Sequence, residues 1–225
     1  MYQTGIEIAG IKKNYKSKTI LKDITFQAKR GSCVGLLGGN GSGKSTLLSI
    51  MAGVLKSDAG SFLYAGEDLL QKKVLAEKVI GYVPQGNPLM EELSAWDNLR
   101  LWYSKEELCR ELESGVLKML GVDEFIKLPV RKMSGGMKKR LSIGCCVANN
   151  PEILLLDEPS AALDVVCKER IYSYLETYKS KGGIIILATH DTQEIELCDK
   201  CYILKDGRLK EYQYDGDIHH LAGCL

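Results

Sequence analysis

Residues 38–46 constrain the fold of this chain more than any other stretch. They read Gly-Gly-Asn-Gly-Ser-Gly-Lys-Ser-Thr and match the phosphate-binding pattern G-x-x-x-x-G-K-[ST]. The short apolar run 33–37 before the loop predicts a buried strand, and residues 46–52 after it predict a helix that ends at Gly53. Strand, glycine-rich loop and helix start follow in the order that a phosphate site needs, which favours a P-loop over a flexible Gly/Ser linker.

The helix start after this loop is suited to an anion. Its first N–H groups have no partner inside the helix, its dipole is positive at this end, and glycines let the loop turn further N–H groups inward. Lys44 is expected to reach the β- and γ-phosphates, and the Ser45 hydroxyl is expected to ligate Mg²⁺. The residues expected to bind the phosphates are Gly38, Gly39, Asn40, Gly41, Ser42, Gly43, Lys44, Ser45 and Thr46.

Composition narrows the class of protein. A chain of 225 residues is long enough for one domain with a substantial core and room for a subdomain. The net charge of +1 gives no electrostatic reason to expect a nucleic-acid partner. No apolar run approaches the length of a membrane span, and residues 1–4 lack the apolar stretch of a signal peptide, so we expect a protein made and kept in the cytosol.

The eight cysteines are expected to be reduced in a cytosolic protein. Cys198 and Cys201 have the spacing of half a zinc site, which Cys224, His219 and His220 could complete in principle. Because only one C-x-x-C pair is present, plain thiols are the favoured interpretation.

The order of the apolar segments predicts an α/β fold. Residues 6–28 show partial alternation and predict an N-terminal antiparallel sheet. The continuous apolar runs 153–156 and 184–188 are typical of parallel strands buried on both faces. Residues 203–212 predict a closing hairpin. The expected architecture is therefore a mainly parallel core sheet preceded by an antiparallel β subdomain.

A helical segment interrupts these strands from about residue 87 to about 148. Capping boxes predict helix starts at Ser94 and Ser104. We interpret the segment as an α-helical subdomain inserted into a single domain that spans residues 1–225. Four apolar residues near its start fit either core packing or a partner surface: Leu89, Met90, Leu93 and Trp96.

Two further features each allow two interpretations. Ser134, followed by Gly135 and Gly136, predicts a helix start that suits a phosphate, although by itself it most simply indicates an ordinary capped helix. Tyr15 lies among the first expected strands, where it could pack in the core or stack on a base through its aromatic face.

Polar residues follow directly after three of the expected strands. Asp157 and Glu158 end the run 153–156, and two adjacent carboxylates there are costly to bury without a role. Asp157 is suited to hold Mg²⁺, and Glu158 is suited to act as a base on water. Gln85 and His190 follow two other strands, where open α/β sheets gather their ligands.

Taken in this order, the motifs resemble those of the nucleotide-binding subunit of an ABC transporter, over essentially the whole chain. Residues 133–137, Met-Ser-Gly-Gly-Met, resemble that family's signature Leu-Ser-Gly-Gly-Gln, which separates it from other P-loop NTPases. The other matches are the Walker A loop at 38–46, Walker B with the catalytic glutamate at 153–158, the Q-loop glutamine Gln85, the D-loop at 160–164, the H-loop histidine His190 and the adenine-stacking aromatic Tyr15.

The resemblance implies a P-loop NTPase that hydrolyses ATP with Mg²⁺. Glu158 would polarise the attacking water, His190 would steady the γ-phosphate, and Lys44 would hold the phosphates. The implied Mg²⁺ ligands are Ser45, Asp157 and Gln85.

Two positions depart from the family pattern, and Met133 in place of Leu is the conservative one. Met137 stands where the signature has Gln, and the resemblance implies that Ser134, Gly135 and Gly136 carry the phosphate contacts. The form Ser-Gly-Gly-Met-Lys-Lys-Arg resembles ATPase subunits of exporters for drugs, antibiotics or lipids.

The resemblance also implies partners. In the family, ATP lies between the P-loop of one subunit and the signature helix of another that faces it head to tail. A chain with one of each would pair with a second copy or a paralogue and would power a separate integral membrane permease. It would lie on the cytoplasmic face of the cell membrane, peripheral to it, and no nucleic-acid partner is expected.

Three other classes of protein fit the sequence less well. A non-transport ABC ATPase acting on ribosomes or DNA usually has two fused ATPase domains or a long coiled coil, and the sequence shows neither. An ATP-dependent regulatory module that binds without hydrolysis is opposed by Glu158 and His190. A nucleoside kinase is opposed by the signature.

Overall fold

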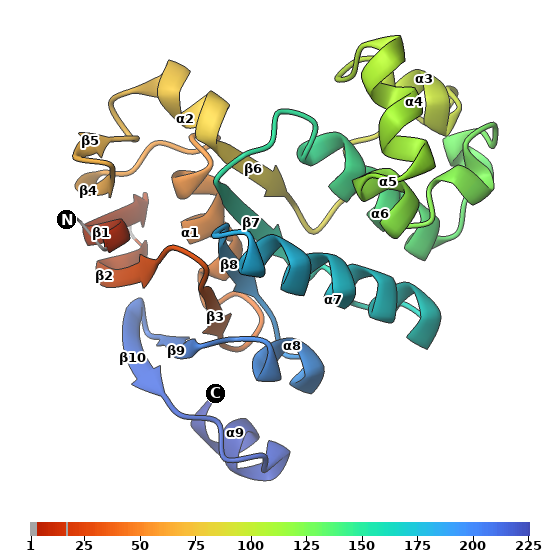
Figure 1. Ribbon diagram of the computed structural model, residues 1–225. Helices are drawn as coiled ribbons and strands as arrows, with labels where there is room; N and C mark the ends of the chain where they lie inside the picture. The colour runs from red at the N-terminus through yellow and green to blue at the C-terminus, as the bar shows by residue number, and fades with distance from the viewer. Residues whose placement is uncertain (1–3, 17) are drawn as a thin grey trace.

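The computed structural model describes residues 4–16 and 18–225, which form two β-sheets with helices around them (Figure 1). Residues 1–3, on which the expectation about a signal peptide partly rests, lie outside the described residues.

The central sheet has six strands and is mainly parallel, as predicted. They are β3 (Cys33–Leu37), β6 (Ile80–Val83), β7 (Ile153–Asp157), β8 (Ile184–Ala188), β9 (Lys200–Lys205) and β10 (Arg208–Tyr212). Their order is β10-β9-β3-β8-β7-β6, and every neighbouring pair is parallel except β9 and β10, which form the predicted hairpin. The loops after β3, β6, β7 and β8 therefore meet at one edge of the sheet.

The middle strands of this sheet are buried on both faces. Along β7, Ile153 and Leu155 belong to one hydrophobic cluster, whereas Leu154 and Leu156 belong to another. Successive strand side chains point to opposite faces, so an unbroken apolar run is what a strand between two cores needs.

The N-terminal strands form a second, antiparallel sheet. Its strands are β1 (Thr4–Tyr15), β2 (Lys18–Lys29), β4 (Ala59–Tyr64) and β5 (Glu67–Asp68). Their order is β2-β1-β4-β5, and all pairs are antiparallel. The expected N-terminal antiparallel sheet is confirmed.

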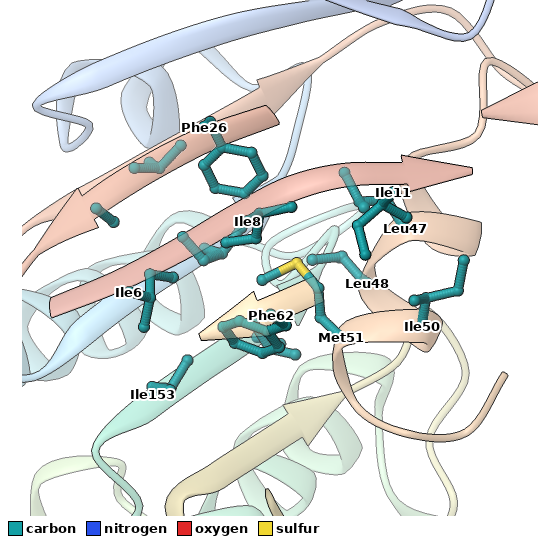
Figure 2. Packing of buried hydrophobic residues seen from close by; sticks show 14 of the residues in the cluster. Ile6, Ile8, Ile11, Phe26, Leu47, Leu48, Ile50, Met51, Phe62 and Ile153 are labelled. Carbon is teal, nitrogen blue, oxygen red and sulfur yellow. The ribbon is translucent and has the colours of Figure 1, made fainter. Parts of the chain in front are cut away.

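Helix α1 (Lys44–Met51) is held in the core between the two sheets (Figure 2). Its residues Leu47 and Leu48 are fully buried in the same cluster as Ile8 of β1 and Ile153 of β7. Burying one such side chain is worth about 1.5–3 kcal/mol, so packing on both sides fixes the start of α1 and the loop that precedes it.

The remaining helices form two groups. An arm beyond β6 in Figure 1 holds α3 (Ala95–Leu99), α4 (Lys105–Glu113), α5 (Val116–Met119), η1 (Asp123–Phe125), η2 (Val130–Lys132) and α6 (Gly135–Cys146). The others are α2 (Lys73–Val79), α7 (Val165–Ser180), α8 (Thr192–Glu196) and α9 (Ile218–Cys224). No helix in the described ranges has both the length and the apolar composition to cross a membrane.

The helix starts predicted in the arm are confirmed. Ser94 and Ser104 each accept a hydrogen bond from the backbone three residues on, and each capping box is complete. The apolar residues near the start of the arm divide: Leu89 and Trp96 pack against the core, whereas Met90 is 54 % exposed.

Candidate functional site

The loop between β3 and α1 curls because glycines take backbone angles that other residues avoid. Gly43, directly before α1, has φ +111°, and a Cβ there would lie 3.0 Å from the Ile20 side chain. No side chain caps the N-terminus of α1, so its first N–H groups remain available to a ligand.

Lys44 lies folded over this loop. Its side chain is buried, and its Nζ donates to Gly38 O at 2.5 Å and Gly39 O at 3.3 Å. Burial lowers the pKa of Lys44, and the carboxylates of Glu158 and Asp157 oppose that effect. The loop thus surrounds a cation that has carboxylates beside it and room to exchange carbonyl partners for an anion.

Asp157 ends β7 with its side chain 2 % exposed. Burial raises the pKa of this carboxyl, and a hydrogen bond with the Ser45 hydroxyl partly opposes the rise. An acid held in this position without a full set of partners is suited to receive a cation.

Two of the predicted residues, Gln85 and His190, converge on Glu158. Gln85 Nε2 donates to Glu158 Oε2 at 2.9 Å, and His190 Nδ1 lies 3.5 Å from Glu158 Oε1. Glu158 has φ +49°, which is unfavourable for a side chain with a Cβ, and its N–H donates to Ala188 O at 2.9 Å. Strained backbone of this kind persists where the surroundings fix it, and it gathers at active sites.

The site is a hollow of about 430 Å³. Tyr15 stands at its rim with 46 % of its surface exposed, and Lys13 Nζ lies 5.5 Å from the centre of its ring. The core-packing alternative for Tyr15 is therefore not what the structure shows, and its ring remains available for stacking. The lining residues are Tyr15, Ile20, Asn40, Gly41, Ser42, Gly43, Lys44, Ser45, Thr46, Gln85 and Glu158.

Glu158 also lines a second hollow, which has a volume of about 320 Å³. His190 lines it, together with the turn 160–162 and the start of α8. Glu158 therefore lines both hollows and contacts His190, which lines the second one.

The residues at the start of α6 lie apart from this site. Ser134 Oγ accepts a hydrogen bond from Met137 N at 3.2 Å, so the predicted N-cap is confirmed. Ser134 and Gly135 are exposed, Gly136 is buried, and none of the three lines the hollow at the P-loop. Within one chain, the structure brings together the loop, Asp157, Glu158, Gln85, His190 and Tyr15 but leaves the α6 start facing outward.

Sequence reasoning missed two buried charged residues beside the site. Lys139 on α6 is 5 % exposed, and Glu194 on α8 is 1 % exposed. Glu194 lies against the hydroxyls of Ser160 and Thr189, which flank Glu158 and His190 in sequence, and its Oε1 has no hydrogen-bond partner among the described residues. Both residues sit in polar stretches, and no sequence pattern marked either as buried.

The burial of Glu194 leads to a prediction about how the stability of the protein depends on pH. Burial raises the pKa of Glu194 above its ordinary value of 4.5, so the folded chain keeps a proton that the unfolded chain releases at lower pH. Its contribution to the free energy of unfolding is therefore lost as pH rises through the folded pKa. We expect Glu194→Gln to gain stability relative to the parent as pH rises from 4.5 towards neutrality, measured by urea denaturation.

The matched control is Glu196→Gln, an exposed carboxylate on the same helix. It is expected to follow the parent at every pH. An identical pH dependence for Glu194→Gln and the parent would show that Glu194 titrates normally.

The family model described as "ABC transporter" matches residues 21–161 of this chain.

Three curated proteins are similar to this chain over most of their own length. Nod factor export ATP-binding protein I of Rhizobium sp. (strain N33) is 34 % identical over 230 residues, covering 100 % of this chain and 76 % of that protein. Linearmycin resistance ATP-binding protein LnrL of Bacillus subtilis is 34 % identical, covering 91 % of this chain and 67 % of that protein. Lantibiotic transport ATP-binding protein SrtF of Streptococcus pyogenes is 31 % identical, covering 94 % and 92 %.

Solved structures of ABC ATPase subunits have the same fold as this chain. A dimeric ATP-binding cassette in a post-hydrolysis state, bound to ADP and phosphate, superposes with a TM-score of 0.82 at 28 % identity, covering 92 % of this chain and 98 % of that one. CbiO1 of Clostridium perfringens, part of an ABC transporter complex, has a TM-score of 0.78 at 30 % identity, covering 92 % of this chain and 87 % of that one.

Proposed function

The chain belongs to the ABC transporter family as an ATP-binding, ATP-hydrolysing subunit, and on that premise we propose how its residues divide the work. The observation that carries the proposal is the convergence of Gln85 and His190 on the single carboxylate of Glu158, beside the loop that holds Lys44. The proposed reaction is in-line attack of water on the γ-phosphate of ATP.

Glu158 is the proposed base. It polarises the attacking water, while Gln85 fixes one of its oxygens and His190 steadies the γ-phosphate. The Gln85 hydrogen bond to one carboxylate oxygen and the His190 contact with the other restrict the side chain before the substrate arrives, which lowers the cost of ordering it in the reaction.

The loop and Tyr15 are the proposed ATP-binding elements. The N–H groups of residues 38–46 and the Lys44 ammonium hold the phosphates. Tyr15 stacks on the base, because its half-exposed ring stands at the rim of the same hollow.

The residues present fit Mg²⁺. Asp157 is a buried carboxylate whose pKa is raised by burial, and it shares a hydrogen bond with the Ser45 hydroxyl. Oxygen ligands of this kind, few in number and completed by phosphates and water, are what Mg²⁺ prefers. We propose that Ser45, Asp157 and Gln85 hold the ion, which when bound neutralises charge on the β- and γ-phosphates.

A second subunit completes the site. ABC cassettes dimerise, and in this chain the exposed start of α6 does not line the hollow of its own P-loop. We propose that Ser134, Gly135 and Gly136 bind the γ-phosphate of ATP held by a partner, which is a second copy or a paralogue facing head to tail. Bound ATP then stabilises the closed pair of subunits, because its γ-phosphate contacts both of them. Hydrolysis removes this shared contact, and the two subunits separate.

Two adjacent glycines test this arrangement. A Cβ on Gly135 would meet nothing within 4 Å, whereas a Cβ on Gly136 would lie 2.5 Å from Cys167 Sγ. Gly135→Ala is therefore expected to fold as the parent does and to lose about tenfold or more in ATPase rate, because the methyl group occupies the partner's phosphate space. Gly136→Ala is expected to lose about 1–3 kcal/mol of stability through overpacking.

Urea denaturation and steady-state ATPase assays separate the two effects. If Gly135→Ala kept the full ATPase rate, the start of α6 would have no contact with the nucleotide of a second subunit.

The subunit works with a membrane permease, and we propose that the helical arm carries nucleotide-driven closure to it. Met90, Leu101 and Trp102 are each more than half exposed on this arm, as apolar residues at a partner contact would be. We place the subunit on the cytoplasmic face of the cell membrane. The three curated relatives are named for export, resistance or lantibiotic transport, and by this likeness we propose an exporter.

A further inference from the structure

Lys139 is a buried cation that the proposed mechanism leaves unused. Its side chain is 5 % exposed, and it lies on α6 about one turn beyond the exposed start of that helix. Burying an ammonium group costs free energy unless its donors are satisfied. Among the described residues, its hydrogen-bond partners are two carbonyls: Nζ donates to Pro84 O at 3.1 Å and to Gln85 O at 3.3 Å.

These carbonyls belong to the turn that carries the Gln85 side chain. That side chain donates to Glu158 Oε2 at 2.9 Å. Lys139 therefore joins α6 to a turn that contacts the proposed base, and the two ends of this link are 54 residues apart in the chain.

The next residue holds the other side of α6. Arg140 is also buried, its Nη1 donates to Leu120 O at 2.7 Å, and its guanidinium carbon lies 5.0 Å from the centre of the Phe125 ring. Arg140 thus fixes α6 to the rest of the helical arm, while Lys139 fixes α6 to the turn at Gln85. Through these two consecutive cations, α6 connects the other helices of the arm to the site.

The surrounding charges suit a cation at this point. Burial lowers the pKa of Lys139, and the carboxylates of Asp157, Glu194 and Glu158 act in the opposite direction. A neutral side chain of the same length would be cheaper to bury, so the charge itself is expected to have a task.

We infer that Lys139 is a positioning residue, which holds Gln85 in place against Glu158 and makes that placement depend on the position of α6. When the start of α6 binds the partner's nucleotide, Lys139 transmits the position of the helix to the chain's own Gln85. The inference rests on the proposed function, in which the α6 start of one subunit faces the ATP of the other. The proposed function does not say which side chain couples the α6 start to Gln85, and Lys139 fills that role.

The test compares four full-length chains: the parent, Lys139→Met, Lys139→Arg and Lys138→Met. Lys139→Met is expected to keep KM for ATP within about twofold and to lose about tenfold in kcat, because ATP still binds the P-loop while Gln85 is no longer held. Lys139→Arg is expected to restore most of the rate, since a guanidinium also donates to two carbonyls. Lys138→Met is the matched control, because the Lys138 Nζ pairs with Glu91, whose side chain is 66 % exposed, and makes no hydrogen bond to the turn at Gln85 among the described residues.

Two results separate a positioning role of Lys139 from a merely structural one. A positioning role lowers kcat of Lys139→Met with little change in KM, and Lys139→Arg recovers the rate. The inference is overturned if Lys139→Met lowers only thermal stability, with kcat per folded molecule equal to that of the parent, or if Lys139→Arg is as slow as Lys139→Met. If Lys139→Met does not fold, Lys139→Gln takes its place, and a kcat equal to the parent's overturns the inference. A parent chain without ATPase activity would instead count against the proposed function, so the two failures are distinct.

Discussion

Glu158→Gln is expected to lower kcat for ATP hydrolysis by about 10²–10⁴-fold, which is the usual cost of losing a general base. The amide cannot take a proton from water, yet it keeps the size of the carboxylate and can still accept the Gln85 hydrogen bond, which now measures 2.9 Å. ATP affinity is therefore expected to stay within a few-fold of the parent. Steady-state ATPase assays and binding of a fluorescent ATP analogue measure the two quantities.

The matched control for this variant is Glu152→Gln. Glu152 lies directly before β7, at the end opposite Glu158, and it pairs with Arg30 near the surface. It is expected to keep the parent rate. Hydrolysis by Glu158→Gln at the parent rate would mean that another group activates the water.

Lys44→Met is expected to weaken ATP binding about 100-fold. A hydrogen bond to a charged group is worth about 1.5–3 kcal/mol, and each 1.4 kcal/mol is tenfold in Kd, so losing the ammonium contact to two phosphates has an effect of this size. The thermal stability of Lys44→Met without nucleotide is not expected to fall in the way that its ATP affinity does. Burial lowers the pKa of Lys44, which means that the folded chain disfavours its charge, so the nucleotide-free variant is expected to melt at or above the Tm of the parent.

Differential scanning fluorimetry with and without Mg-ATP measures both effects. Lys44→Met is expected to lose the rise in Tm that ATP gives the parent. Lys73→Met, an exposed lysine on α2, is expected to keep that rise. A normal ATP-dependent rise in Lys44→Met would contradict the role given to the P-loop lysine.

The sequence predicted much of the framework because its signals are local. The P-loop has a fixed spacing, and the runs at β7 and β8 are apolar at every position, which only a doubly buried strand tolerates. Gln85, Asp157, Glu158 and His190 could be grouped in advance because each lies at or just beyond the carboxyl end of a strand of the parallel sheet. The two capping boxes at Ser94 and Ser104 were also visible as short patterns.

The parts that escaped prediction depend on contacts between distant segments. Helices α8 and α9 have five and seven residues, too few for a helical period to stand out. Lys139 reads as one more charge in a basic stretch, and only the fold places it against carbonyls 54 and 55 residues away. Glu194 is likewise a carboxylate in a polar segment that tertiary packing buries against Ser160 and Thr189.

In the proposed function, ATP is enclosed between the P-loop of one subunit and the α6 start of another. The molar mass of Glu158→Gln, measured by size-exclusion chromatography with light scattering with and without Mg-ATP, tests this enclosure. We expect a monomer without nucleotide and a dimer with it, and a return to monomer when Gly135→Ala is added to the same chain. A chain that binds one ATP per molecule and keeps the mass of a monomer would contradict the symmetric pair.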